Sequence, residues 1–340
     1  MAPNKGRAAR PSGRRDLGWT PAVSGWLQER RSRRQVVLFH YGPFQLLWQQ
    51  PGVIQCGPQI TAEHELANPA ALAVPVPQVG ALQAALRRRN LSGAGVLVHY
   101  SDPFLIRAAG LQGLRQWRGP KLLVCGDLHH GPAPIDTLVG YWQQQFHDAV
   151  LLAFNPVLLD DVQRRLPVPV RCLPPGFFRY PRRARAAAPA RVLVHVGSLG
   201  PHHPQRRALV EALQQRGRVP FAHVTTATAE QAADVYAAHA LVLNVPLNND
   251  LNHRFYEVMA AGAPQLVFGR PTLLGPLQEL ANRPDLIWVD QLEQVEAVAT
   301  ALLNDPSLAA RPVAPPPEWP MHELLKRALG PAAAAPHTLA

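Results

Sequence analysis

The stretch LNVPLNNDLNHRFYEVMAAGAP (243–264) places polar and charged side chains where an apolar strand runs into a helix. Arg254 and Glu257 lie three residues apart on nearly the same face of that helix. A helix N-terminus attracts phosphate, an arginine donates two hydrogen bonds to it, and a glutamate accepts hydrogen bonds from a ribose diol. We therefore consider as nucleotide-binding residues Asn249, Asp250, Asn252, Arg254 and Glu257. The alternative is a surface ion pair between Arg254 and Glu257, with the Asn and Asp residues capping the helix.

A second junction, VLVHVGSLGPHHPQRRALVEAL (192–213), has the same character. Gly197 and Ser198 end a buried strand, where backbone N–H groups can approach a phosphate because no Cβ intrudes. Arg206 and Arg207 lie in the first turn of the next helix, a position that disfavours cations unless an anion is near. The spacing is neither GxxxxGK[ST] nor GxGxxG, so P-loop and Rossmann dehydrogenase sites are not indicated. Ser198 is alternatively an ordinary loop residue.

The third candidate is the segment KLLVCGDLHHG (121–131). Asp127, His129 and His130 follow an apolar strand and are our candidates for catalysis on a sugar hydroxyl or phosphate. Adjacent ligands in a loop without further partners are weak evidence for a metal, so we expect none. A loop hydrogen-bond network is the alternative for these three residues.

Short apolar runs alternate with helical patterns along the chain, which indicates parallel sheets with helices on both faces. In the first half we expect strands at 35–41, 95–103 (including the turn that follows), 121–127 and 148–154, and helices at 81–90, 104–117, 134–146 and 155–166. Asn155 is well placed to cap the last of these helices. The pattern restarts with strands at 190–197, 221–227, 240–246 and 264–269.

These patterns divide the chain into two α/β halves, and ligands of such sheets bind outside the carboxyl ends of the strands. We expect a disordered basic tail (1–34), an N-terminal Rossmann-like domain (35–178), a Pro/Arg linker (179–190), a C-terminal Rossmann-like domain (191–310) and a Pro-rich segment with a short helix and tail (311–340). Two doubly wound α/β domains would thus face each other across a cleft.

The distribution of charge and the number of cysteines indicate which partners and which location to expect. Residues 1–34 carry nine Lys/Arg against Asp16 and Glu29, a net +7 of the +11 for the whole chain, so the remainder is close to neutral. A basic tail suits an anionic membrane surface or simple solvation, and no aromatic interleaving or zinc-finger spacing indicates specific nucleic-acid binding. The three cysteines form no CxxC pair, and we expect neither a signal peptide nor a membrane span. We therefore predict a cytoplasmic protein, peripheral to the membrane if the tail binds it.

The motifs HVGSLGPHHPQR (195–206), LVLNVP (241–246) and DLNHRFYEVMAAGAP (250–264) resemble the C-terminal domain of glycosyltransferases with the GT-B fold, within the glycosyl transferases group 1. More specifically they resemble the spore-maturation CgeB-like proteins, whose N-terminal domain is similar to the GDLHHG and HDAVLLAFN segments here. The resemblance spans roughly residues 36–305.

The resemblance implies metal-independent transfer of a sugar from a nucleoside-diphosphate sugar, with no further cofactor, to an acceptor that the sequence does not identify. It also implies that the C-terminal domain (191–310) binds the nucleotide sugar and that the N-terminal domain (35–178) faces the acceptor. Glu257 matches the family's ribose-binding glutamate, whereas Asn249 stands where another glutamate is usual. Ser198 stands where an arginine is frequent, with Arg206 and Arg254 as substitutes. Because of these departures, two alternatives stay open: a catalytically inactive nucleotide-sugar- or glycan-binding relative, and a sugar-nucleotide epimerase.

Overall fold

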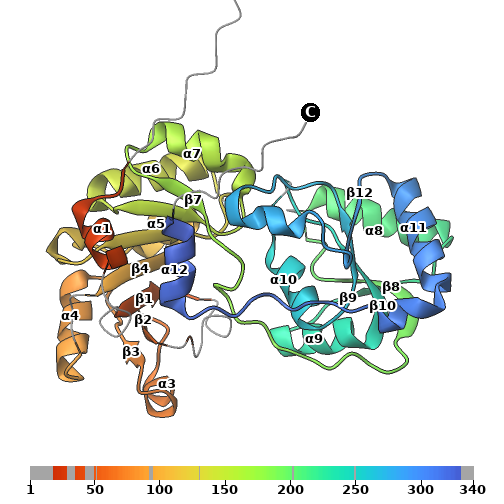
Figure 1. Cartoon of the computed structure of the whole chain (residues 1–340), viewed down its shortest axis with the longest axis horizontal. Coiled ribbons are helices and arrows are strands. Elements are labelled where there is room, and N and C mark those ends of the chain that lie inside the picture. The colour runs from red at the N-terminus through yellow and green to blue at the C-terminus, as the bar shows by residue number, and fades with distance from the viewer. Residues whose placement is uncertain are drawn as a thin grey trace, which may run out of the picture.

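The computed structural model describes residues 18–28, 35–42, 50, 52–91, 95–129, 131–200, 203–248 and 250–330. Two α/β lobes lie side by side, and each is built around a parallel sheet (Figure 1). The first lobe precedes the second in the chain, apart from one C-terminal helix that returns to it.

The N-terminal sheet has seven parallel strands in the order β3-β2-β1-β4-β5-β6-β7. Its strands are β1 Val36–His40, β2 Val53–Gly57, β3 Ala71–Ala73, β4 Val96–Ser101, β5 Lys121–Cys125, β6 Ala149–Leu152 and β7 Val170–Cys172. Its helices are α1 Pro21–Gln28, α3 Ala62–Ala67, α4 Val79–Arg88, α5 Pro103–Ala109, α6 Pro134–Gln145 and α7 Leu159–Arg165, with the 3-10 turns η2 Leu114–Gln116 and η3 Pro156–Leu158. Strands β1, β4 and β6 are buried along their whole length, as their apolar sequences predict for strands covered on both faces.

The C-terminal sheet has five parallel strands in the order β12-β11-β10-β8-β9. Its strands are β8 Ala190–Val196, β9 Phe221–Val224, β10 His239–Asn244, β11 Gln265–Phe268 and β12 Leu286–Val289. Its helices are α8 Pro204–Arg216, α9 Ala229–Ala238, α10 His253–Ala260 and α11 Leu292–Asn304, with η4 Gly275–Leu280 and η5 Pro306–Ala310. Pro204 begins α8 and Gly217 ends it in a left-handed conformation, as expected from the residue preferences of helix ends.

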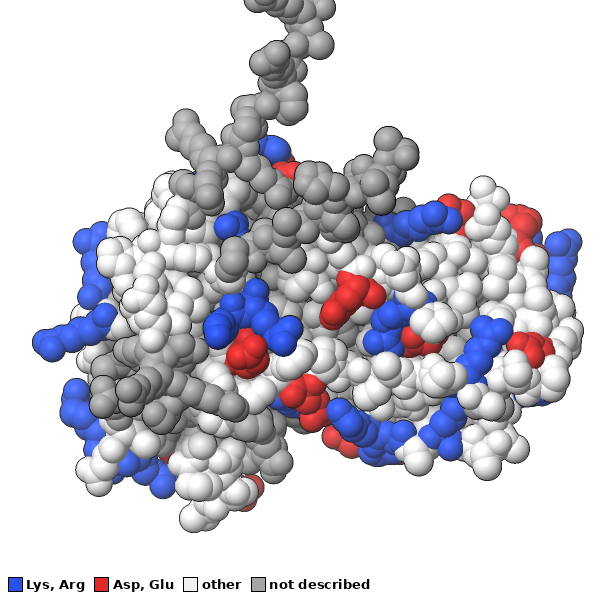
Figure 2. Space-filling view, in the orientation of Figure 1, with Lys and Arg blue, Asp and Glu red and all other residues white. Residues whose placement is uncertain are grey.

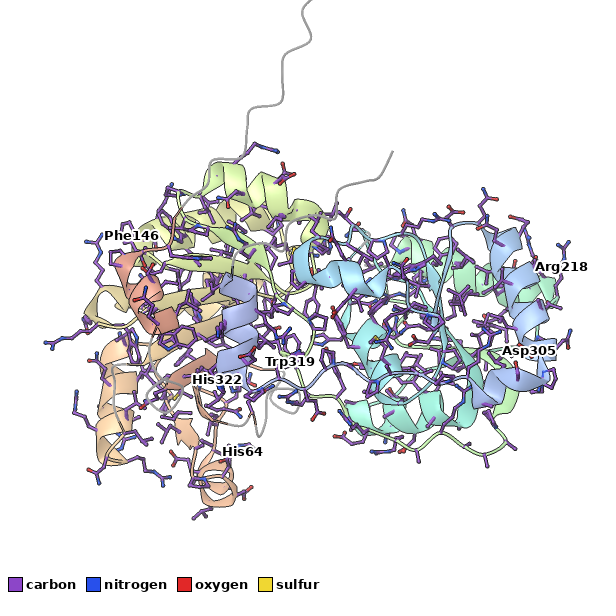
Figure 3. The ribbon with its side chains drawn as sticks, in the orientation of Figure 1. His64, Phe146, Arg218, Asp305, Trp319 and His322 are labelled. Atoms are coloured by element: carbon purple, nitrogen blue, oxygen red, sulfur yellow. The ribbon has the colours of Figure 1, made fainter. Side chains whose placement is uncertain are left out.

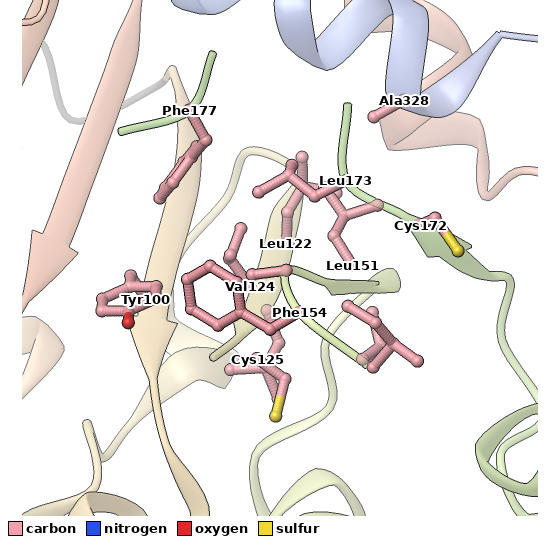
Figure 4. Packing of buried hydrophobic residues seen from close by; sticks show 14 of the residues in the cluster. Tyr100, Leu122, Val124, Cys125, Leu151, Phe154, Cys172, Leu173, Phe177 and Ala328 are labelled. Carbon is pink, nitrogen blue, oxygen red and sulfur yellow. The ribbon is translucent and has the colours of Figure 1, made fainter. Parts of the chain in front are cut away.

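Helix α12, Met321–Leu329, packs on the N-terminal lobe although it is the last described element of the chain. Its apolar face includes Ala328, which lies near strand β7 in the core shown in Figure 4. That core continues into the second lobe through Leu251 and Phe255, so the two lobes share buried apolar contacts. Apolar packing therefore fixes how the two sheets sit relative to each other.

The chain crosses between the lobes twice, between β7 and β8 and again between η5 and α12, and these two segments contact each other. Arg179 Nη2 donates to the Trp319 carbonyl (2.7 Å), and the Arg182 guanidinium pairs with the Glu318 carboxylate (2.8 Å). Trp319 lies between the lobes in Figure 3. Arg185 then donates to the carbonyl of Ala240 (2.7 Å), so the arginines of this crossing segment tie it to backbone oxygens of the second lobe.

Three features differ from the sequence-based expectation. Residues 21–28, expected in a disordered tail, form helix α1, because Val23 and Trp26 are buried in the core of the first lobe. Residues 1–17 and 29–34 of that tail lie outside the described ranges. The helix expected over 104–117 ends at Ala109, since Gly110 leaves the helical conformation. Strands β2 and β3 were not predicted.

Basic and acidic side chains are interspersed over the face shown in Figure 2. Within the described ranges, no helix has the length and apolarity required to span a bilayer. The proposed contact of the basic tail with an anionic membrane falls on residues that the structure largely leaves undescribed.

Candidate functional site

The order of the C-terminal strands indicates where a ligand would bind. Strand β8 lies between β10 and β9, so the chain winds in opposite directions on its two sides, and ligands of doubly wound sheets bind at the carboxyl ends of the strands at such a point. The segments that leave the sheet there follow β8 at Gly197 and β10 at Val245. These are the two junctions that the sequence indicated.

Gly197 and Arg254 lie directly against each other. A Cβ placed on Gly197 would be 2.0 Å from Arg254 Nη2, and Gly197 has a φ of +131°. Any other residue here would collide with the guanidinium and would be strained as well. Gly197 therefore allows the α10 arginine to reach the end of β8, which brings the two sequence motifs into one site.

The Arg254 guanidinium is poorly satisfied. Its Nε and Nη1 atoms are buried and have no hydrogen-bond partner among the described residues. Buried donors are nearly always paired in folded proteins, so an unpaired pair of donors indicates a ligand or solvent in that position. No ion pair between Arg254 and Glu257 is found in the described part of the chain, which argues against the simple surface salt bridge.

Arg206 has a different role, because its donors are already used. Its Nε and Nη2 atoms donate to the Val245 carbonyl at 3.2 and 3.0 Å, and Nη1 lies 3.4 Å from the Ser198 carbonyl. The side chain is 6% exposed and joins the loops that follow β8 and β10. Burial, together with the nearby Arg254 charge, lowers the pKa of Arg206 to about 10, although Asp250 opposes this shift. Arg206 therefore holds the two loops together and adds positive charge to the site.

The Ser198 side chain forms a hydrogen bond within its own loop. Its hydroxyl accepts a hydrogen bond from the Gly200 N–H at 3.0 Å, which agrees with the ordinary loop role. The neighbouring His195 was not predicted. Its Nδ1 donates to the Leu243 carbonyl (2.9 Å), its buried Nε2 has no partner in the described residues, and burial with the Arg254 charge lowers its pKa to about 2. His195 therefore presents a neutral ring to the site.

Glu257 is held by a tyrosine from the neighbouring helix. The Tyr236 hydroxyl on α9 donates to Glu257 Oε2 at 3.1 Å. Burial raises the pKa of Glu257, while Arg254 and the tyrosine hydrogen bond oppose that rise. The carboxylate is thus held by Tyr236 within the range of the Arg254 charge.

The loop before α10 contains the remaining C-terminal candidates. Asn252 caps the helix, since its Oδ1 accepts from the Phe255 N–H at 3.1 Å, and its Nδ2 donates to Asn244 Oδ1 at 3.2 Å. Asn252 thus serves as a cap, which was the alternative considered for it. Asp250 is 4% exposed, and burial raises its pKa to about 8, with Asp127 acting in the same direction. Asn249 lies outside the described residues.

The candidates of the first lobe form a hydrogen-bonded loop. Asp127 Oδ1 accepts from the His129 N–H at 2.8 Å, and the Asp127 N–H donates to Asp102 Oδ1 at 2.8 Å. Asn155 does not cap its helix as predicted; its Oδ1 accepts from the Leu128 N–H (2.9 Å), and its Nδ2 lies 2.8 Å from His129 Nε2. The loop network considered as the alternative is therefore present. His130 lies outside the described residues.

The loops of the two lobes meet. His129 Nε2 lies 3.8 Å from Asp250 Oδ2, and the Leu251 N–H donates to the Phe154 carbonyl at 2.8 Å. His253 packs against Phe154 with ring centroids 4.4 Å apart, and burial lowers the pKa of His253 to about 4. The structure thus brings together predicted residues of both halves: Asp250 lies near the loop after β5, and α10 contacts the loop after β6 through His253.

Sequence reasoning missed Asp102, Asn155, His195 and Tyr236 as members of the site. Asp102 directly follows strand β4, so its position at the carboxyl edge was a signal that the sequence offered. Tyr236 lies inside a helix, and nothing in its local sequence marks it. Among the described residues, no group of three His, Cys, Asp or Glu side chains is arranged to hold a metal ion.

Comparison with known proteins agrees with this geometry. Residues 183–314 match a family described as glycosyl transferase-like, which covers less than half of the chain. No curated protein shows significant sequence similarity to the chain. The family match covers the C-terminal sheet and α10, where Arg254 and Gly197 meet.

Solved structures extend the comparison to both lobes. A sucrose-phosphate synthase from Thermosynechococcus elongatus superimposes with a TM-score of 0.52 at 12% identity, over 87% of this chain and 95% of that one. An α-glucosyltransferase, solved with UDP-glucose and DNA containing an abasic site, gives 0.53 at 11% identity, over 87% and 94%. The resemblance to the CgeB-like group stays a prediction. The chain has the GT-B fold of two Rossmann-like domains, and its second half carries the sequence pattern of a glycosyl transferase-like family.

Proposed function

We propose that the protein is a glycosyltransferase that takes a sugar from a nucleoside-diphosphate sugar held on the C-terminal lobe. One observation carries the proposal: two buried donor atoms of Arg254 have no partner among the described residues, close to the carboxyl ends of β8 and β10. A diphosphate would satisfy both donors. The match of residues 183–314 to a glycosyl transferase-like family supports the same role.

In this proposal the C-terminal lobe stabilises the leaving group. Negative charge grows on the nucleoside diphosphate as its bond to the anomeric carbon breaks, and preorganised donors in a water-poor site stabilise that charge. Arg254 and the N–H groups at the start of α10 would bind the phosphates, and Arg206 would add a fixed positive charge. The role requires no metal ion. Glu257 would accept hydrogen bonds from the ribose hydroxyls, oriented by Tyr236.

The acceptor would bind over the N-terminal lobe, where Asp127 and His129 follow strand β5. If the reaction inverts the anomeric centre, one of them serves as the base that takes the acceptor proton. If it retains the configuration, they position donor and acceptor. The acceptor is not specified by these residues, and a contact of the basic N-terminal segment with an anionic membrane remains part of the proposal.

The test uses the full chain. Unfolding temperature is measured with UDP, GDP, TDP and ADP in turn, and the nucleotide with the largest stabilisation is titrated by calorimetry against the wild type and Glu257→Ala. We expect one diphosphate to bind, and Glu257→Ala to weaken it strongly without loss of folding. Exposed Glu230 on α9 gives the control Glu230→Ala, whose affinity should not change. Equal affinity of wild type and Glu257→Ala would contradict the assignment.

A catalytically inactive binding protein is the second candidate, favoured because Asn249 occupies the position where the related enzymes have a glutamate. Incubation with labelled nucleotide sugars separates the two: slow hydrolysis of the donor identifies an enzyme, whereas tight binding without hydrolysis identifies an inactive relative. Release of nucleoside diphosphate without an epimerised sugar would exclude an epimerase.

A further inference from the structure

Asp250 is the least satisfied acidic group of the site. Its carboxyl group is 4% exposed, and Oδ1 has no hydrogen-bond partner among the described residues. Four charged or titratable groups face it: Arg206 on α8, Arg254 on α10, and Asp127 and His129 from the loop after β5. A buried carboxylate with an unpaired oxygen is costly, so the state of its proton must be settled by these neighbours.

The hydrogen bonds around His129 determine what it can offer Asp250. Asn155 Oδ1 accepts from the Leu128 N–H at 2.9 Å, which orients the amide so that Nδ2 faces His129 Nε2 at 2.8 Å. Because the amide nitrogen is a donor, His129 Nε2 must accept and carries no proton. The 3.8 Å approach of His129 Nε2 to Asp250 Oδ2 is therefore not an ion pair. A charged Asp250 would face a lone pair rather than a donor.

Taken together, burial and the other neighbours favour the protonated form of Asp250. Burial and the Asp127 charge both raise the pKa of Asp250, to about 8, and the two arginines together with a hydrogen bond from the Leu247 backbone only reduce that rise. Arg206 is also largely committed to the Val245 carbonyl through Nε and Nη2. Geometry and electrostatics agree on a neutral carboxyl group at pH 7.

We propose that Asp250 is held as a neutral carboxylic acid and that it donates its proton, as a hydrogen bond, to an oxygen of the diphosphate bound by Arg254. The proposal rests on the proposed function, since it assigns a role within that site. An ionised Asp250 would repel the phosphates, whereas the acid adds a donor beside the guanidinium.

The proposal predicts a pH dependence that Asp250 alone causes. Diphosphate binding favours the protonated form, so affinity is full below pH 8 and falls about tenfold from pH 7 to pH 9, with uptake of roughly one proton on binding at pH 9. Arg206 keeps most of its charge at pH 9, since its pKa is about 10, and contributes little over this interval.

The experiment is calorimetric titration of the full chain with UDP and GDP at pH 7 and pH 9, in two buffers of different ionisation enthalpy at each pH. Asp250→Asn keeps a donor of the same shape but cannot titrate. We expect it to lose the tenfold pH effect and to take up no proton at pH 9. Exposed Asp290 supplies the control Asp290→Asn, which should keep the wild-type pH dependence.

The outcomes are distinct. Binding with the same pH dependence in the wild type and Asp250→Asn would overturn the proposal while leaving the proposed function intact. Linkage seen only with sugar nucleotides, and absent with UDP and GDP, would overturn the assignment to a phosphate oxygen. Failure of every nucleotide to bind would instead refute the proposed function. If Asp250→Asn does not fold, wild-type proton uptake at pH 9 decides, because its absence overturns the proposal without a variant.

Discussion

Replacement of Arg254 by Met should make the unliganded protein more stable and nucleotide binding weaker. Methionine fills a similar volume without hydrogen-bond donors. In the wild type, Nε and Nη1 of Arg254 are buried and unpaired among the described residues, and each such donor costs about 1–3 kcal/mol. After allowance for the favourable packing that the guanidinium itself provides, we expect the free energy of unfolding to rise by about 1–3 kcal/mol.

Binding should change in the opposite direction. Charge-assisted hydrogen bonds contribute about 1.5–3 kcal/mol, so loss of the guanidinium should weaken a bound diphosphate roughly 10- to 150-fold. Denaturant unfolding gives the stability, and calorimetric titration with the preferred nucleotide gives the affinity. The control is Arg270→Met, at an exposed arginine of the same lobe. Lower stability of Arg254→Met with unchanged affinity would show that Arg254 is structural, and would refute the reasoning.

Three further predictions follow from single contacts. Gly197→Ala should abolish nucleotide binding, because the new Cβ would lie 2.0 Å from Arg254 Nη2 and would displace the guanidinium. In the control Gly200→Ala, the new Cβ meets only the flexible Ser198 hydroxyl at 3.3 Å, so this variant should bind nucleotide normally. Equal nucleotide affinity of the two variants would contradict the close approach of Gly197 and Arg254. Tyr236→Phe removes the hydrogen-bond donor to the Glu257 carboxylate and should weaken nucleotide binding by about 0.5–1.5 kcal/mol in the same titration. Unchanged nucleotide affinity of this variant would disprove the prediction. Burial keeps His99 and its stacking partner His147 neutral when folded, with the pKa of His99 lowered to about 3. Unfolded histidines gain a proton below about pH 6.5, so the stabilisation from these neutral histidines is full above that pH and is lost as the pH falls. Protonation of His99 in the unfolded state alone should lower the free energy of unfolding by about 2 kcal/mol at pH 5. Thermal unfolding of wild type and His147→Phe from pH 7 to pH 5 checks this, and parallel curves for the two would argue against it.

The sequence predicted the strands that have a continuous apolar run and missed β2 and β3, which lack one. Val36–His40 and Ala190–Val196 are apolar and β-branched, which is how strands covered on both faces read. Ala71–Ala73 is three residues long without β-branching, and Val53–Gly57 contains a buried glutamine, so neither has a strong local pattern. Helix α1 was missed because only Val23 and Trp26 are buried, within a strongly basic segment.

The sequence predicted which candidate residues lie together better than it predicted their individual contacts. Residues after β8 and β10 were found because the carboxyl ends of parallel strands share one edge of a sheet. The different roles of Arg206 and Arg254 depend on which carbonyl groups lie nearby, and this is set by tertiary packing. Asn155 was read as a local helix cap, yet its amide serves the loop after β5, which no local sequence rule predicts.

The central claim is that a nucleoside diphosphate binds where β8 and β10 diverge, and crystals soaked with the preferred diphosphate test it most directly. The account predicts phosphate density against Arg254 Nε and Nη1, above Gly197 and at the N-terminus of α10, with the ribose toward Glu257. Density for the nucleotide at any other place on the molecule, with Arg254 unchanged and unpaired, would contradict it.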